Sequence, residues 1–283
     1  MEKYTYIKEL LSTAIGAEGT VLIPRKIYET LIEEVDKALI PRSEAAYYYG
    51  AAQIPGTSID LNLQALNKMK VRLTGEGAEI VQDQTEYSGT NVKPKKYSVS
   101  VAVSRELMED AQWNLLEDNI RIAGKRFAEN ENSLVIAALD GAANTVSGGA
   151  AITIANITRA RQYLHDSDFK PTTFVIGYEV LNDLNNIDTF VEFQKVGNTD
   201  MLTKGFLGNI FGMNVIATST NAGMTTTSSY IFDRDHAYII AEKRPVSIEN
   251  LNLPQFDQER AYITQRITTA ALRTGAIAKI TTT

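Results

Sequence analysis

The chain has 283 residues, 44% hydrophobic and 22% charged, a balance typical of a globular protein that folds as one large or two smaller domains. It contains no cysteine, which excludes a disulfide framework, a thiolate nucleophile and a cysteine-bound metal. A net charge of -6 with a pI near 5.2 argues against broad binding of nucleic acid, and no apolar run approaches the roughly 20 residues that cross a bilayer, so no membrane contact is expected.

The N-terminal segment, residues 1–49, is expected to form an arm followed by a helix. Residues 1–23 contain a short amphipathic piece and show no secretory signal. From Pro24, a favourable residue at the start of a helix, apolar side chains recur on one helical face as far as Leu39. Pro41 then ends the pattern, because proline cannot continue a helix.

Residues 50–97 are expected to form a long hairpin with little core of its own. Apolar and polar residues alternate over 57–63 and again over 67–73, which is typical of strands, and Gly75–Gly77 offers a turn. Few large apolar residues occur here, and a two-stranded ribbon is only marginally stable in water by itself. The hairpin is therefore expected to be stabilised by lying on another surface.

Basic residues are concentrated in this hairpin. One interpretation is a solvated face of the ribbon. The other is an inter-subunit contact, in which the basic face pairs with an acidic surface of a neighbouring subunit. Binding to nucleic acid is the weaker hypothesis, because only Tyr87 and Tyr97 are available to stack on bases. The residues of this candidate contact are Lys68, Lys70, Arg72, Lys93, Lys95 and Lys96.

The next stretch predicts one strand that runs directly into one long helix. Residues 97–103 alternate with period two, and Ser104 is expected to cap a helix that continues to Leu139 and stops at Gly141. About 36 helical residues at ~1.5 Å each give a rod of roughly 54 Å, about three times the usual helix length. Such a rod is typical of a structural spine. Its expected apolar face consists of Met108, Ala111, Leu115, Ile122, Phe127, Leu134 and Ala138.

The second half of the chain predicts a mixed α+β order, without the regular βαβ repeat of a doubly wound sheet. Helices are expected over 157–165 and 178–185. Asp233–Asp235 is expected to form a charged turn between two short strands. The expected strands cover residues 172–177, 214–218, 230–232, 237–241, 261–268 and 276–281.

No constellation of residues indicates an enzyme, and no catalytic, cofactor-binding or metal-binding residue is expected. His165 and His236 each stand beside acidic residues, in segments typical of solvated turns or helix ends. The sequence contains no phosphate-loop, nucleophile-elbow or paired-histidine zinc motif. Carboxylate pairs such as Glu129 and Glu131 carry no information about catalysis without their geometry. Three glycines are expected to serve tight turns rather than a dinucleotide site, namely Gly205, Gly208 and Gly212.

The order of an arm, a sparse hairpin, a long spine helix and a compact α+β portion resembles the HK97-like major capsid proteins of tailed bacteriophages and related archaeal viruses. Two stretches strengthen the resemblance. Residues 204–222, KGFLGNIFGMNVIATSTNA, are similar to the glycine-rich G-x-L-x-G-x-P-V segment of that family, although Met213-Asn214 replaces the usual proline-containing pair. Residues 238–251, YIIAEKRPVSIENL, resemble the strand that follows in such proteins.

The resemblance implies an α+β, HK97-like capsid fold over nearly the whole chain. Because the chain reaches Pro24 almost directly, no scaffolding segment is expected before the arm, and assembly is expected to use a separate scaffolding protein or none. The parts that the resemblance implies are an N-terminal arm and helix (1–49), an extended loop or E-loop (50–97), the spine helix with the peripheral domain (98–150), an axial domain (151–240) and return strands of the peripheral domain (241–283).

The resemblance also implies a function, that of a major capsid protein assembling into pentamers and hexamers. These are expected to close into an icosahedral shell that encloses packaged double-stranded DNA without sequence-specific binding. The expected partners are other copies of the chain and separate scaffolding, portal and decoration proteins, and no cofactor is expected. The expected location is the virion, after assembly in the host cytoplasm.

Two other interpretations stay open at this point. An encapsulin has the same fold and forms a cellular nanocompartment around a cargo enzyme, but the sequence shows no clear match to the helix that holds the cargo peptide. A soluble α+β enzyme or ligand-binding protein would be a monomer or small oligomer with an apolar pocket and convergent polar groups. The absence of catalytic motifs from the sequence weighs against this last interpretation.

Overall fold

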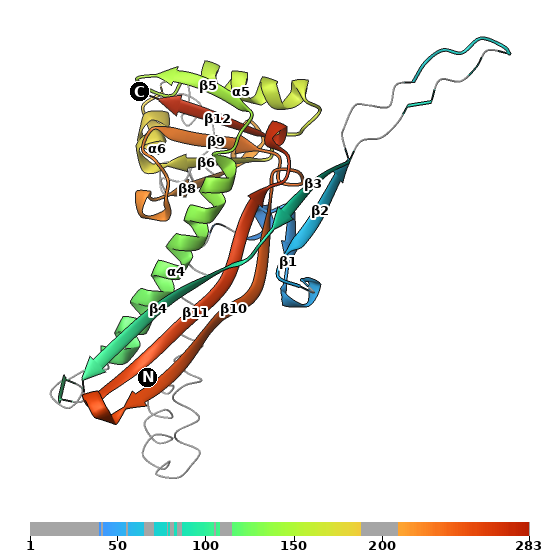
Figure 1. Cartoon of the computed structure of the whole chain (residues 1–283). Helices are drawn as coiled ribbons and strands as arrows, with labels where there is room; N and C mark the ends of the chain where they lie inside the picture. The colour runs from blue at the N-terminus through green and yellow to red at the C-terminus, as the bar shows by residue number, and fades with distance from the viewer. Residues whose placement is uncertain are drawn as a thin grey trace, which may run out of the picture.

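Two β-sheets joined by one long helix make up the body of the molecule, and a thin ribbon projects from its side (Figure 1). The expected arm, the helix from Pro24, and Lys68 and Lys70 lie outside the described residues. The computed structural model describes residues 40, 42–54, 56–64, 71–77, 79, 82–83, 87–104, 106–107, 115–187 and 209–282.

The first sheet is long and narrow, with four strands in the order β1-β10-β11-β4. Antiparallel pairing joins β10 to β11 and β11 to β4, while the short β1 pairs in parallel with β10. The strand predicted at 97–103 is confirmed as β4, and the strands predicted at 237–241 and 261–268 are parts of the much longer β10 and β11. Their bounds are β1 (Tyr47–Tyr49), β4 (Lys95–Ser104), β10 (Tyr238–Leu253) and β11 (Gln258–Ala271).

Helix α4 (Leu115–Leu139) packs along one face of this sheet. Ser104 caps the start of the expected helix, because its Oγ accepts a hydrogen bond from the Leu107 backbone N–H at 3.3 Å. Residues 108–114 lie outside the described part, so the described spine is the 25-residue helix from Leu115, about 37 Å long. It ends at Leu139, as predicted, just before Gly141.

The buried face of α4 differs from the expected apolar face. Phe127 is buried as predicted, but Ile122 is 56% exposed, so its placement on that face was wrong. Leu134 and Ala138 are partly buried and pack against the core, as expected, and the buried stripe also includes the polar residues Glu131 and Asn132, which hydrogen bond to other elements. Of the other expected members, Met108, Ala111 and the side chain of Leu115 lie outside the described part. The buried members are Ile120, Ala123, Phe127, Ala128, Glu131, Asn132, Val135, Ile136 and Leu139.

The second sheet has six strands in the order β5-β12-β9-β6-β8-β7. The division expected from the sequence places β5 with the spine helix and β12 with the return strands of the peripheral domain, but both strands belong to this second sheet. Hydrogen bonds hold β12 on both sides, in parallel with β5 and antiparallel to β9, and its Ile277 and Ile280 are fully buried there. The strands are β5 (Asn144–Gly149), β6 (Thr173–Gly177), β7 (Asn209–Ile210), β8 (Met213–Thr218), β9 (Ser228–Phe232) and β12 (Ile277–Thr282).

Two predicted helices pack against this second sheet. Helix α5 (Ile154–Asp166) contacts β5, β12 and β9, and helix α6 (Tyr178–Asn185) contacts β6 and β8. The charged turn predicted at Asp233–Asp235 is confirmed. Gly212 makes the expected tight turn between β7 and β8 at φ +81°, whereas Gly205 and Gly208 lie outside the described residues. Within the described residues, five 3-10 turns complete the fold: η1 (Arg42–Glu44), η2 (Ala51–Gln53), η3 (Thr220–Ala222), η4 (Pro254–Phe256) and η5 (Thr274–Ala276).

The C-terminal end of α4 packs between the two sheets and joins them into one core. Val135 and Leu139 of the helix share a buried cluster with Phe232 of the second sheet and Tyr238 of the first. The rings of Phe232 and Tyr238 meet edge to face with centroids 5.7 Å apart, a favourable aromatic geometry. Both sheets and the spine helix therefore form a single continuous body, on which the ribbon is mounted.

Candidate subunit interface

The projecting ribbon is anchored to the body at its root. Its two antiparallel strands are β2 (Ile59–Gln64) and β3 (Tyr87–Val92), and Figure 1 shows the loop beyond them running away from both sheets. At the root, Ile54 and Val92 pack in a small buried cluster with Ile239 of β10. This cluster fixes the direction in which the ribbon leaves the body.

The far end of the ribbon carries apolar side chains without any cover. Val71 and Leu73 are 106% and 105% exposed. The strand predicted over 67–73 is not formed in its described part, but the predicted turn is present, with Gly77 at φ +76°. Burial of such side chains is worth about 1.5–3 kcal/mol each. The tip gains this stabilisation only when it lies on another molecule.

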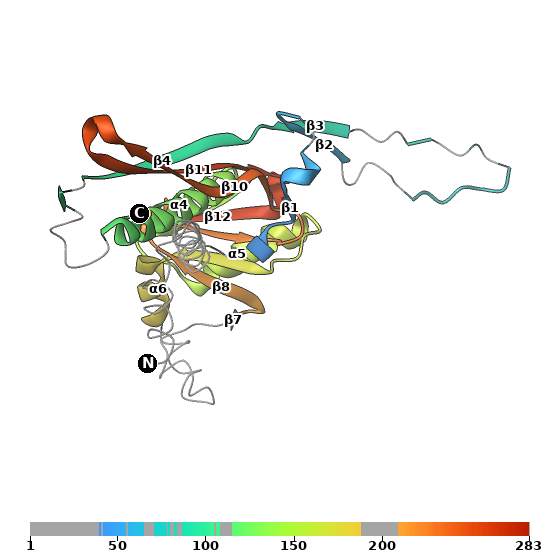
Figure 2. The same cartoon turned by 90° about the horizontal axis from the view of Figure 1, so that it is seen from below.

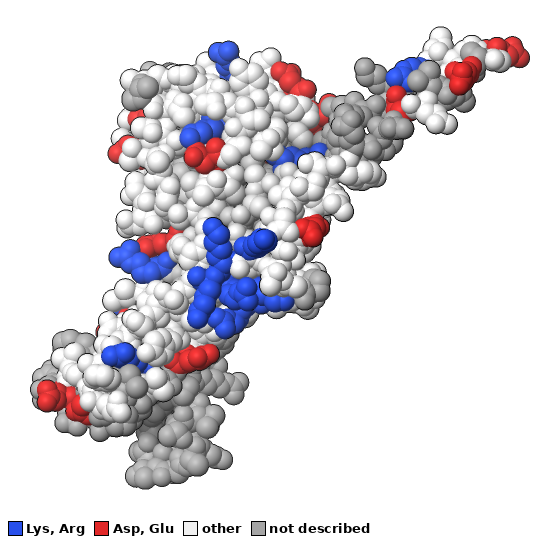
Figure 3. Space-filling view, viewed as in Figure 1, with Lys and Arg blue, Asp and Glu red and all other residues white. Residues whose placement is uncertain are grey.

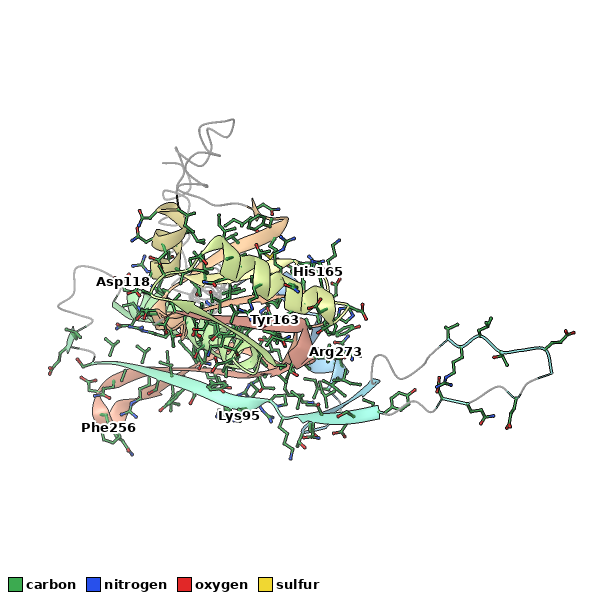
Figure 4. All side chains as sticks on the ribbon, turned by 90° about the horizontal axis from the view of Figure 1, so that it is seen from above. Lys95, Asp118, Tyr163, His165, Phe256 and Arg273 are labelled. Atoms are coloured by element: carbon green, nitrogen blue, oxygen red, sulfur yellow. The ribbon has the colours of Figure 1, made fainter. Side chains whose placement is uncertain are left out.

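The basic residues of the predicted contact do not form one face of the ribbon in the described part of the chain. Arg72 lies near the tip, and its Nη2 is 3.0 Å from Asp83 Oδ1 on the opposite leg, which neutralises its charge within the ribbon. Lys93 follows β3, while Lys95 and Lys96 belong to β4 in the body. Figure 4 labels Lys95 on β4 near the root of the ribbon. These three lysines are exposed.

A further set of cations, which the sequence did not indicate as a site, lies beside Lys96 on the long sheet. Arg266 of β11 is directly opposite Lys96, and Arg244 of β10 is directly opposite Arg266. We call these three residues the basic row. The row lies on the face away from α4, because the alternate residues Gln265 and Ile267 are buried on the helix side. Figure 3 shows basic side chains gathered on this part of the sheet.

A buried charge cluster ties the start of the described chain to α4 and the long sheet. Arg42 binds Glu131 with two hydrogen bonds, Nε to Oε1 at 2.8 Å and Nη2 to Oε2 at 2.9 Å, and its Nη1 lies 3.2 Å from Glu242 Oε2. Gln265 Nε2 donates to Glu242 Oε1 at 3.1 Å, and the Tyr48 hydroxyl donates to the same carboxylate. A two-pronged arginine–carboxylate pair fixes orientation as well as distance.

These contacts set the protonation of Arg42 and Tyr48. Burial lowers the pKa of Arg42, but the hydrogen bond and charge of Glu131 outweigh it, so the pKa is raised overall. Burial, and then the hydrogen bond to Glu242, raises the pKa of Tyr48, which keeps the hydroxyl protonated as a donor. The only indication of this charge cluster in the sequence is Glu131, a charged residue inside an apolar helical stripe.

The enzyme interpretation depends on a pocket, and the described residues form an open one at the second sheet. An open hollow of about 420 Å³ at one edge of the second sheet is lined mainly by polar side chains, among them Glu179 and Asp183. No group of three or more metal-binding side chains occurs in the described part of the chain. His236 Nδ1 lies 3.0 Å from Asp233 Oδ2 within the charged turn, and His165 is exposed near the end of α5. No described helix is long and apolar enough to span a bilayer.

Comparison with protein families gives a match over most of the chain. The model of the family described as Phage capsid protein matches residues 86–280. This range covers β3 of the ribbon, the spine helix, and both sheets apart from β1 and the end of β12. A search of curated protein sequences found no match.

Solved structures share the fold at low sequence identity. The head structure of Helicobacter pylori bacteriophage KHP40 aligns with a TM-score of 0.70 at 11% identity, over 85% of this chain and 88% of that chain. A chain of Mycobacterium phage Che8 aligns with a TM-score of 0.65 at 14% sequence identity, over 80% of this chain and 84% of that chain. The virus-like particle from Pyrococcus furiosus aligns with a TM-score of 0.60 at 16% sequence identity, over 90% of this chain and 98% of that chain. These similarities establish the fold and confirm the HK97-like architecture expected from the sequence.

The family match and the shared fold lead to the same identification. Both are structural rather than enzymatic, and the encapsulin interpretation has no better support than the viral one. The long sheet, the spine helix and the ribbon are the parts that the resemblance implied. The chain therefore belongs to the phage capsid protein family and is a major capsid protein with the HK97-like α+β fold.

Proposed function

We propose that copies of this chain form pentamers and hexamers, which close into an icosahedral shell around packaged double-stranded DNA. The observation that carries this proposal is the ribbon, anchored at its root and bare at its tip. Val71 and Leu73 are fully exposed in the single chain, whereas the body buries its apolar residues in a continuous core. The tip is stabilised when it lies on the body of an adjacent copy.

A contact of this kind joins two different surfaces, the ribbon of one copy and the body of the next. Such heterologous contacts generate rings when the rotation between copies closes. Rings of five and of six need slightly different angles between neighbouring copies. A thin ribbon accommodates that difference more readily than two flat, rigid faces, which supports the use of one chain in both rings.

The charge of the chain suits a container for DNA. A net charge of -6 does not favour tight binding of the phosphate backbone, so the shell would confine the DNA, with counterions screening the repulsion. We propose assembly in the host cytoplasm, with separate scaffolding, portal and decoration proteins as partners. The six basic residues of the predicted contact are part of this proposal, with Lys93, Lys95 and Lys96 acting on the body rather than on the tip.

Serine substitutions at the tip test whether its exposed apolar side chains form the contact between copies. Val71→Ser with Leu73→Ser removes most of the apolar area, and we expect the concentration needed for assembly to rise about a hundredfold. Size-exclusion chromatography with negative-stain imaging distinguishes monomers, rings and shells. The matched control, Val71→Ile with Leu73→Met, keeps the apolar area and is expected to assemble like the wild type.

Two results would contradict the proposal at different points. A serine variant that assembles like the wild type would show that the tip is not the contact. A wild-type chain that stays monomeric at high concentration, with or without a scaffolding protein, would reject the shell itself.

A further inference from the structure

The basic row is a like-charge contact that the described residues leave unneutralised. Lys96, Arg266 and Arg244 stand opposite one another across three strands, and like charges in this arrangement destabilise a sheet. None of the three forms an ion pair with a described residue, and Arg244 Nε is buried without a hydrogen-bond partner in the described part of the chain. The exposed Lys93 and Lys95 add positive charge at the same end of β4. An acidic group from outside the described part of the chain would therefore stabilise the row.

Acidic groups of the required kind lie at the ribbon tip. Glu76 and Glu79 are exposed there, while Asp83 is paired with Arg72. The unpaired charges of the described tip are therefore negative, and Figure 3 shows acidic side chains at the end of the ribbon. Compared with the sequence prediction, the two surfaces exchange roles: carboxylates lie on the ribbon and cations on the body.

The ribbon leaves the body in the layer that carries the basic row. Figure 2 shows β2 and β3 on the side of the long sheet away from α4, with the loop extending in the same layer. The chain from Gln64 to Glu76 spans at most about 40 Å. Figures 1 and 2 show the described tip beyond the edge of its own body, where it is free to lie over the same layer of an adjacent copy.

We propose that the ribbon tip of one copy docks on the basic row of the adjacent copy, with Glu76 and Glu79 beside the three cations. This inference rests on the proposed function, because it names the receiving surface of the ring contact. Docking neutralises the like-charge row and covers Val71 and Leu73 in the same step. Complementary charge also fixes the register of the contact and accelerates association, so assembly is expected to weaken as salt rises.

Charge reversal tests the contact from both sides. The tip-reversed variant carries Glu76→Lys with Glu79→Lys, and the row-reversed variant carries Lys96→Glu with Arg266→Glu. In each, like charges face one another, and we expect the concentration at half-assembly to rise at least about tenfold. A chain with all four substitutions restores opposite charges between the substituted positions, with Arg244 unchanged in every variant. We expect it to assemble within about threefold of the wild type.

The matched control reverses two cations elsewhere. Arg121→Glu with Lys125→Glu, on the exposed side of α4, changes the net charge by the same amount as the row-reversed variant and is expected to leave assembly unchanged. Denaturant unfolding of each purified variant verifies that the body still folds.

Each possible result is decisive. Wild-type assembly by either two-site variant, or a four-site variant that remains as defective as its parents, would overturn the inference. Loss confined to the row-reversed variant would assign the row to another acidic partner and overturn it as well. A wild type and a control that both stay monomeric would instead reject the proposed function.

Discussion

Arg42 supplies the counter-charge for two carboxylates that are almost completely buried. Glu131 comes from α4 and Glu242 from β10, and their side chains are 2% and 4% exposed. Removing one partner of a buried ion pair costs about 3–5 kcal/mol, because the other charge is left uncompensated. Since the Arg42 side chain is 32% exposed, we expect Arg42→Ala to lower the free energy of unfolding by about 3 kcal/mol, at the low end of that range.

Denaturant unfolding of the monomer measures this effect. The control is Arg121→Ala, which removes an exposed pair with Asp118 at 3.6 Å and is expected to cost less than about 0.5 kcal/mol. If both variants lost the same amount, the buried cluster would have no special role in stability.

Asp140, just beyond the end of α4, makes a contribution that depends on pH. The hydrogen bond from Lys279 lowers the pKa of Asp140; burial opposes this, and the hydrogen bond from Tyr230 adds to it. A lowered folded pKa gives stability above the unfolded value of about 3.9, and that stability is lost as pH falls through the folded pKa. Since the carboxylate is half exposed, we expect Asp140→Asn to cost less than about 1 kcal/mol at pH 7.

A pH series of denaturant unfolding for wild type and Asp140→Asn checks the sign of this linkage. The difference between the two proteins is expected to shrink as the pH falls through the lowered folded pKa of Asp140, below which both proteins lack the charge. A difference that grows toward acid would contradict the assignment.

The packing of η3 against α4 depends on a glycine. Gly223 has φ +83°, and a Cβ there would lie 2.6 Å from Ser133 Oγ and 2.9 Å from Ser133 Cα on the helix. Gly212 has nearly the same φ of +81° but open space around it. We expect Gly223→Ala to cost about 3 kcal/mol, combining backbone strain with overpacking, and Gly212→Ala only about 1–2 kcal/mol. Equal losses in the unfolding midpoint would mean that the close approach carries no cost.

Elements with a local pattern could be predicted from the sequence, and their pairing could not. Period-two alternation predicts β4, and helical spacing predicts α5 and α6, because those signals lie within one segment. The place of β12 between β5 and β9 depends on segments more than forty residues apart in sequence, which no local pattern records.

The candidate subunit interface could likewise be predicted only where a local pattern indicates it. Sparse apolar content predicted a ribbon that needs another surface, and the exposure of Leu73 agrees with it. The basic row could not be predicted, because Lys96, Arg266 and Arg244 become neighbours only through strand register. Counting cations along the hairpin therefore placed Lys95 and Lys96 on the ribbon, although both belong to the sheet of the body.

At the scale of the whole molecule, stability and assembly reside in different parts. The body holds its core between two sheets and α4, whereas the ribbon beyond Gln64 and Tyr87 adds nothing to the described core. Replacing residues 65–86 with an Asn-Gly turn joins two residues that already face each other in register. We expect this truncated chain to unfold within about 0.5 kcal/mol of the wild type and to form no shells.

Mixing the truncated chain with the wild type tests the direction of the contact. In a heterologous ring, a truncated copy accepts its neighbour's tip but offers none, so it ends each growing row of subunits. We expect an equal mixture to form far fewer shells, by light scattering, than the same amount of wild type alone. If the contact were instead isologous, between two identical surfaces, truncated copies would be left out and the wild type would assemble unimpaired. Only a directional contact lets a well-folded copy halt its neighbours.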